Sequence, residues 1–263
     1  MATYQTLYLI SIPLIIAAEY RFARNELVRD RYDRWINNFS LGFINEAVLL
    51  ASPVLIPKLL LPESSSPYLH PLLAALVAFL ILDLAGYWLH RAYHRFAGLW
   101  RLHRVHHCDL ELDYSTTFRH HPGEVVVSLL VIYAVMATLA LTPAQVLPYV
   151  IAVKAVQLLS HSNIRLGART ESLINRLFVT PGTHQFHHST QQPQTDSNFA
   201  EVLTIWDRMF GTYTCPRSSA APAAFGLEEC STDGDQRLGA LLALPLRSFG
   251  KRGATGRIDY RSD

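Results

Sequence analysis

The stretch from His90 to His107 constrains this chain more than any other feature. It reads HRAYHRFAGLWRLHRVHH and holds five of the twelve histidines in the sequence. Its first two histidines are four residues apart, and its last three are offset by three and four, so imidazoles lie side by side on a helix face. A third group, HQFHH, repeats these offsets about eighty residues later, from His184 to His188. Any fold of this chain has to accommodate three groups of imidazoles.

A metal centre is the simplest way to bring these groups together. Histidine titrates near neutral pH, and clustered imidazoles repel each other once they are charged. One HxxxH pair is common by chance and more often marks an ordinary surface or core residue, but three such groups in order are not. They predict a polynuclear metal site whose ligands come from eight histidines: His90, His94, His103, His106, His107, His184, His187 and His188.

Two isolated histidines complete the predicted ligand set. His121 stands just before an apolar run in STTFRHHPGE, and His161 closes another apolar run in LLSHSN. His120 is expected at the surface or in contact with ligands, and His70 is expected at the opposite side of the protein. Ten imidazoles would supply about five to each of two ions, which leaves each ion an open position in near-octahedral coordination.

The remaining sequence favours a membrane protein. Half of the residues are hydrophobic, only 17% are charged, and the mean hydropathy is positive. Apolar runs long enough, or nearly so, to cross a bilayer of about 30 Å as helices predict an all-α, integral-membrane helical bundle. The runs cover residues 7–18, 41–61, 72–89, 125–141 and 144–159.

The basic residues predict how this bundle is oriented. Arginines crowd the segment after the first run and the histidine stretch, whereas residues 62–70 and the turn at 142–143 contain neither Lys nor Arg. The positive-inside rule therefore places the N-terminus outside and every histidine group on the cytoplasmic face. We expect a multi-pass membrane protein with a cytosolic, histidine-rich helical cap.

The three cysteines suggest neither a disulfide framework nor a thiolate metal site. Cys108, Cys215 and Cys230 are odd in number, widely spaced, and form no CxxC pair. This pattern fits a reducing compartment best.

The sequence divides into a membrane-embedded part with its metal cap, residues 1–215, and a C-terminal cytosolic tail, residues 216–263. The tail begins with small and turn-forming residues. Residues 237–247, RLGALLALPLR, are short and apolar between arginines, so they are expected to dock on the cap or at the bilayer interface. The last residues, 251–263, are expected to be mobile.

Taken together, the motifs resemble those of the fatty acid hydroxylase and sterol desaturase superfamily. The resemblance runs from about residue 40 to Leu246 and rests on HRAYH, LWRLHRVHH, TTFRHHPGE, SHSN, TPGTHQFHHS and DSNFAEVLTIWDRMFGTY. One departure is Ala200, where the family usually has glycine, and it puts the local backbone geometry in question.

The resemblance implies oxygen-dependent hydroxylation or desaturation of a membrane lipid, such as a sterol or fatty acyl chain, at a di-iron centre. Two iron ions would be the cofactor and O2 the co-substrate, and zinc could replace iron during isolation because nitrogen-rich sites bind zinc more tightly than ferrous iron. No flavin or haem motif is present, so a separate cytochrome b5-like or ferredoxin-like donor is expected. No nucleic-acid partner is expected, and the oligomeric state is not predicted.

Several polar residues near the histidine groups are candidates to orient the ligands. A carboxylate or amide that accepts the remaining N–H of a metal-bound imidazole fixes its tautomer and its direction. Plain solvated or capping roles fit each of them equally well. The candidates are Asp83, Asp109, Asp113, Asn163, Asp196, Asn198 and Asp207.

Two other functional classes remain open. A membrane zinc hydrolase could use the same histidines, although it would be expected to carry a catalytic glutamate in a motif such as HExxH, which is absent. A metal-binding or transport protein would be expected to spread its ionisable residues through the bilayer midplane, whereas these histidines gather at one face.

Overall fold

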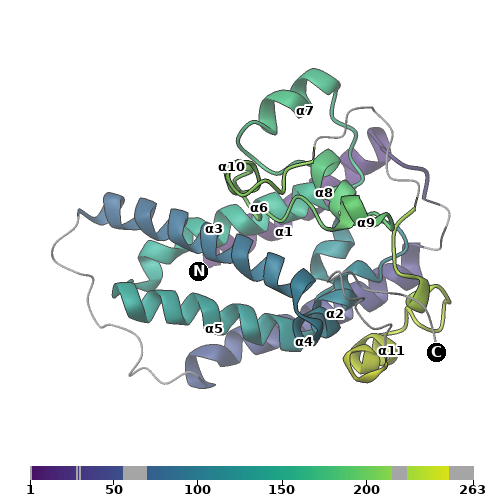
Figure 1. Ribbon diagram of the computed structural model, residues 1–263, viewed down its shortest axis with the longest axis horizontal. Helices are drawn as coiled ribbons and strands as arrows, with labels where there is room; N and C mark the ends of the chain where they lie inside the picture. The colour runs from purple at the N-terminus through teal and green to yellow at the C-terminus, as the bar shows by residue number, and fades with distance from the viewer. Residues whose placement is uncertain (1, 28, 30, 56–69, 215–223, 249–263) are drawn as a thin grey trace.

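The protein is a bundle of long helices with a group of short helices gathered at one end (Figure 1). The computed structural model describes residues 2–27, 29, 31–55, 70–214 and 224–248. Within these residues there is no β-strand, only three isolated β-bridges. The predicted all-α fold is confirmed.

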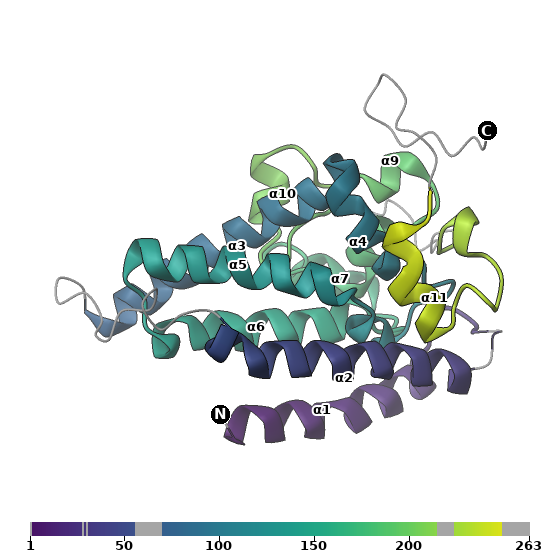
Figure 2. The ribbon, with the colours of Figure 1, turned by 90° about the horizontal axis from the view of Figure 1, so that it is seen from below.

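Three described helices are long and apolar enough to cross a membrane: α3 (Pro71–Arg95), α5 (Pro122–Leu139) and α6 (Pro143–Ser160). Each begins with proline, which suits the first turn because no intrahelical partner exists there for a backbone N–H. The other two predicted runs fall in α1 (Ala2–Arg21) and α2 (Arg31–Leu55), which run alongside the bundle (Figure 2). Residues 56–61 of the second run lie outside the described residues.

The bundle is held together by a core between α3, α5, α6 and the segment near Val202. Apolar side chains on the outer sides of the spans are exposed, among them Leu76 on α3, Leu130 on α5 and Ile151 on α6. Exposed apolar side chains of this kind are what a membrane helix needs in order to contact lipid. The buried residues of this core are Ala78, Leu82, Met136, Leu141, Val146, Tyr149, Val202 and Leu203.

The short helices form a cap over the ends of α3 and α6. Phe96 adopts an extended conformation, which ends α3 and lets α4 (Ala97–His107) pack back against it. The later cap helices are α7 (Ala168–Ile174), α8 (Pro181–His187), α9 (Gln192–Thr195), α10 (Ile205–Met209) and α11 (Leu238–Ala243).

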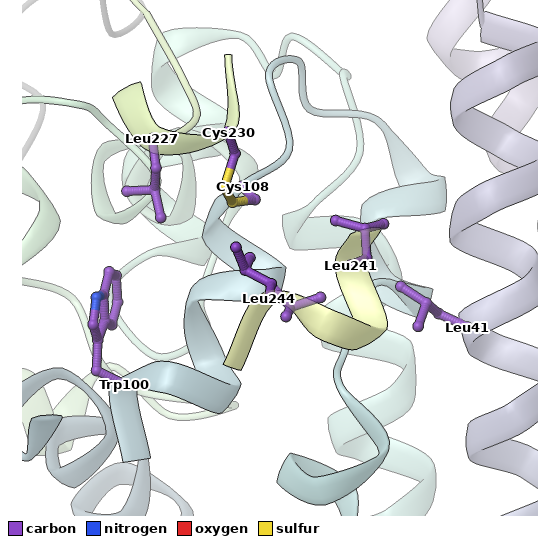
Figure 3. Packing of buried hydrophobic residues seen from close by; sticks show 8 residues of the cluster. Leu41, Trp100, Cys108, Leu227, Cys230, Leu241 and Leu244 are labelled. Carbon is purple, nitrogen blue, oxygen red and sulfur yellow. A yellow bond between two sulfur atoms is a disulfide. The ribbon is translucent and has the colours of Figure 1, made fainter. Parts of the chain in front are cut away.

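The C-terminal segment packs on the cap, the first of the two placements expected for it. Leu241 of α11 and Leu244 of the 3-10 turn η4 (Leu244–Leu246) are buried against Leu41 of α2 and Trp100 of α4 (Figure 3). Residues 251–263, which were expected to be mobile, and residues 216–223 at the start of the tail lie outside the described residues.

Cys108 and Cys230 form a disulfide, so the prediction that the cysteines are unpaired is wrong (Figure 3). Cys108 caps the C-terminus of α4, and Cys230 ends the 3-10 turn η3 (Glu228–Cys230). The two are 122 residues apart in sequence. They come together only because the tail packs against α4, and the spacing of the cysteines in the sequence does not predict that packing. The inference of a reducing compartment from these cysteines loses its basis.

A buried ion-pair network joins α2 to the segment after α4. Arg34 donates to both oxygens of Asp109, at 3.0 and 3.1 Å, and to Asp113 at 3.0 Å. Burial raises the pKa of Asp109, but the charges of Arg34 and Arg119 outweigh it and lower this pKa from 3.8 to about 2. Because the folded-state pKa is depressed, the stabilisation is complete above pH of about 4 and is lost as the pH falls towards 2.

Replacement of Arg34 by methionine should strongly destabilise the cap. It removes the cation that bonds directly to two buried carboxylates, a loss of about 3 to 5 kcal/mol. The matched control is Arg29→Met, since Arg29 pairs at 2.7 Å with Asp233, whose side chain is 93% exposed; such exposed pairs contribute about 0 to 1 kcal/mol. Thermal unfolding in detergent micelles measures both. Equal, small shifts in Tm would show that the network is not structural.

Candidate metal centre

Nine of the ten predicted ligand histidines gather in two adjoining clusters under the cap. In each cluster the candidate ligand atoms lie within 4.8 Å of one another, and all of these histidines are buried. The five-histidine cluster consists of His90, His94, His103, His107 and His187. The four-histidine cluster consists of His106, His161, His184 and His188.

The clusters draw on elements far apart in sequence. The HxxxH pair lies on the last two turns of α3, and the following HxxHH group lies on α4. In α8, Thr180 closes a capping box with Thr183 and Pro181 occupies the first turn, so the helix starts at a fixed point before its histidines. His161 caps the C-terminus of α6. The three spacing motifs thus form helical faces, as their offsets predicted.

Fixed acceptors orient the rings of the five-histidine cluster. Nδ1 of His90 lies 2.9 Å from the carbonyl of Phe199, and Nδ1 of His187 lies 2.9 Å from the carbonyl of Ser197. Nδ1 of His103 lies 2.8 Å from Oε1 of Glu124. A carbonyl or carboxylate oxygen only accepts, so each Nδ1 carries the hydrogen and each Nε2 keeps its lone pair. These three Nε2 atoms are buried without a hydrogen-bond partner.

In the four-histidine cluster the Nε2 atoms face one another. His161 Nε2 lies 3.0 Å from His106 Nε2 and 2.8 Å from His184 Nε2, which is 3.2 Å from His188 Nε2. His161 donates its Nδ1 hydrogen to the carbonyl of Gln157, at 2.7 Å. Two nitrogens bound at right angles to one ion through bonds of about 2.1 Å lie about 3.0 Å apart. The donor atoms of this cluster therefore fit a shared metal ion.

Burial keeps these rings neutral, which is the form that binds metal. Burial, followed by the neighbouring histidines, lowers the pKa of His106 and His188 well below 6.5. Burial also lowers the pKa of His161 and His187 to about 3. At neutral pH these four imidazoles therefore carry lone pairs rather than charges and do not repel a cation.

The adjacent residues His120 and His121 lie in different surroundings, and His121, the predicted ligand, is outside both clusters. His121 caps the N-terminus of α5, where its Nδ1 accepts from the amide of Gly123 at 3.0 Å and its Nε2 faces the carbonyl of Leu242. It belongs to neither cluster. His120 instead stacks on His106, with ring centroids 4.2 Å apart, and its Nδ1 lies 2.9 Å from Glu124.

Of the polar residues predicted to orient ligands, Asp196 approaches a cluster histidine, with Oδ1 3.5 Å from Nδ1 of His94. The others stabilise the cap. Asp83 accepts from the amides of Val202 and Leu203. Asp109 and Asp113 bind Arg34 as described above.

The remaining three predicted residues hold loop backbone. Asn163 exchanges hydrogen bonds with the backbone of Asn25. Asn198, at φ +54°, bridges the carbonyls of Thr183 and Thr214. Asp207 binds the amides of Phe199 and Ala200 and so fixes the segment whose carbonyl orients His90. Ala200 is not among the described residues with positive φ, so the alanine there strains nothing.

Two glutamates at the site were not predicted. Glu124 is buried and accepts from both His103 and His120, so it joins them in a third group that could hold a metal. Glu201 lies 3.4 Å from Nδ1 of His90. The sequence signal for Glu124 was its place in the first turn after HHP, which is equally typical of a helix-capping charge.

A cavity of about 280 Å³ reaches both clusters from the cap side. His107 and His188, one from each cluster, form part of its wall. Thr195, Glu228 and residues on either side of the disulfide-bonded Cys230 also line it. The cavity therefore adjoins both clusters.

Known proteins match about half of this chain in sequence. Alkylglycerol monooxygenase from Danio rerio is 31% identical over 52% of this chain, and ornithine lipid hydroxylase from Rhizobium tropici is 31% identical over 53%. Methylsterol monooxygenase 1-3 from Arabidopsis thaliana is 28% identical over 56%. The matches cover 30%, 41% and 50% of those proteins, respectively. No solved structure matches this chain.

The sequence profile described as fatty acid hydroxylase matches residues 75–212, a range that starts in α3 and ends just after α10. It contains all nine clustered histidines together with Glu124 and Glu201. The chain belongs to the fatty acid hydroxylase family.

Proposed function

We propose that this protein is a lipid oxygenase that hydroxylates or desaturates a membrane lipid at a histidine-ligated di-iron centre. The observation that carries the proposal is the pair of adjoining imidazole clusters, with lone-pair nitrogens buried at the end of an apolar bundle. Bound iron would supply the reduction of O2 and the cleavage of an unactivated C–H bond.

The protein's own contribution is to hold the metal ligands, to orient their rings and to exclude water from the site. Backbone carbonyls and Glu124 fix the rings, so that little reorganisation accompanies metal binding. The clusters are closed to bulk water on the bundle side by α3 and α6, whose histidines are no more than 5% exposed. The exclusion of water suits a reaction whose reactive species would otherwise be quenched.

Iron fits the donor set better than zinc. Structural zinc sites are usually satisfied by four ligands, whereas one cluster here offers five. Neutral imidazoles leave a ferrous pair positively charged and so favour the reduced state. Zinc remains the metal that isolated protein would acquire if iron is scarce.

The substrate class follows from the relatives and the surface. The three relatives are named for alkylglycerols, ornithine lipids and methylsterols, all of which are lipids. The lipid would reach the centre through the bundle rather than through water. Electrons would come from a separate cytochrome b5-like or ferredoxin-like donor, since the sequence carries no flavin or haem motif.

Isotope labelling separates the oxygenase from the alternative zinc hydrolase. Iron-loaded protein in lipid nanodiscs is supplied with a reductant, the three lipid classes and 18O2. Hydroxylation should place 18O in the lipid product, and desaturation should consume O2 while removing two hydrogens. A product that carries oxygen only from H2 18O, formed without O2, would establish hydrolysis instead. Glu124, already bound by two histidines, is poorly placed to activate water.

Substitution of two histidines tests the ligand assignment. His187→Ala should weaken iron binding by more than about tenfold and abolish turnover, because even the loss of a residue that only orients a ligand costs 10- to 100-fold in many metal sites. His121→Ala is the matched control, being near the clusters but outside them, and should retain iron. Chelator competition gives the affinities. An equal loss of iron affinity in both variants would show that His121 also contributes to iron binding and would contradict the ligand assignment.

Redox trapping tests the orientation. We propose that the cap faces the cytoplasm, as the arginine distribution favours. In that compartment the Cys108–Cys230 bond should be reduced in living cells and form only after lysis. Acid quenching followed by alkylation under denaturing conditions should therefore modify both thiols. A bond that is already closed in quenched cells would place the cap on an oxidising side and overturn this orientation.

A further inference from the structure

Two ionisable residues lie on the bundle side of the centre and have no part in metal binding. Lys154 is half-buried in the membrane span α6, and Glu201 lies in the segment between α9 and α10, against α3. Ionisable groups are costly within membrane spans and mark substrate or ion sites there. Metal binding by the two clusters does not explain why Lys154 and Glu201 are present there.

One carboxylate oxygen of Glu201, Oε1, can accept a hydrogen bond from a ligand. Its Oε2 accepts from Nε2 of Gln157 at 3.0 Å. Its Oε1 lies 3.4 Å from Nδ1 of His90, but that nitrogen already donates to the carbonyl of Phe199 at 2.9 Å. The side chain is 22% exposed, so a ligand can reach it. A strong acceptor is thus held next to the five-histidine cluster.

Helix α3 has a glycine, Gly86, where it faces the Glu201 side chain. A Cβ atom at Gly86 would lie 3.2 Å from Cγ of Glu201 and 3.0 Å from the hydroxyl oxygen of Tyr149. Glycine at this position lets both side chains approach the backbone of α3. The carboxylate and the phenol therefore lie on the same small patch of α3, one turn before His90.

Lys154 continues the polar surface along α6. Residues 154, 157 and 161 share one face of a helix, so Lys154, Gln157 and the cluster residue His161 form a stripe that leads to the centre. Among the described residues, no hydrogen bond or ion pair engages the Lys154 side chain. The stripe offers a donor at Lys154 and an acceptor at Glu201.

We propose that Glu201 and Lys154 bind the hydroxyl-bearing head of the lipid substrate and so present a carbon close to that head to the five-histidine cluster. The inference rests on the proposed lipid oxygenation and narrows its substrate class. Hydroxyls fit because each can donate to Glu201 and accept from the amine of Lys154. An ammonium head has no acceptor for Lys154, and a carboxylate head has no donor for Glu201. A lipid oxidised in mid-chain would place hydrocarbon against both polar side chains.

Binding of a radiolabelled lipid to zinc-loaded protein tests this without turnover. Scintillation-proximity measurements in detergent micelles give the Kd of hexadecane-1,2-diol and of its dimethyl ether, which lacks the donors. The unmodified protein should prefer the diol by about tenfold or more, the scale of a hydrogen bond to a charged group. Glu201→Gln should remove most of this preference while leaving the ether's Kd unchanged.

Glu228→Gln is the matched control, since Glu228 lines the cap-side cavity and not the stripe. Loss of the diol preference in this variant, but not in Glu201→Gln, would place the head in the cavity and overturn the proposal. Tighter binding of hexadecylamine than of the diol would overturn the choice of hydroxyls. Because zinc-loaded protein does not consume O2, a diol preference lost only in Glu201→Gln supports the head site even if the 18O experiment fails.

Discussion

The hydrogen bonds that fix the Nδ1 atoms of the histidines are the interactions on which the rest of the site depends. Free imidazoles this close together would rotate, protonate and repel. The carbonyls of Phe199, Ser197 and Gln157 accept their hydrogens and turn the other nitrogen of each ring inward. The Nε2 atoms of His90 and His187 are thereby buried without a partner, and the Nε2 atoms of the four-histidine cluster face one another. A bound cation would satisfy both groups of nitrogens.

The rest of the fold secures those acceptors. Asp207 holds the amides of the Phe199 segment, and the Arg34 network ties α2 to the connection after α4. The apolar spans need no polar interactions of their own to remain in lipid, so the buried polar groups are concentrated in the cap. On the bundle side of the centre, the polar side chains include Glu201 and the stripe of Lys154, Gln157 and His161.

Local patterns in the sequence predicted which histidines share a helical face, but not which residues those faces contact in the folded protein. The HxxxH and HxxHH offsets held because helix geometry is local. The sequence did not show that His121 faces away from both clusters, since adjacent residues point in different directions and the direction of each depends on where α5 starts. The acceptors of the ring hydrogens are mostly backbone carbonyls, which leave no side-chain signature. The Cys108–Cys230 pair depends on tertiary docking alone.

We expect the two clusters together to hold a pair of metal ions. Protein purified and loaded with ferrous iron under anaerobic conditions, then freed of loosely bound metal, can be assayed for iron per chain. Two irons per chain are predicted, one for each cluster. A value of one, or none, would contradict the account, because it would mean that the buried nitrogens of at least one cluster are satisfied without a metal.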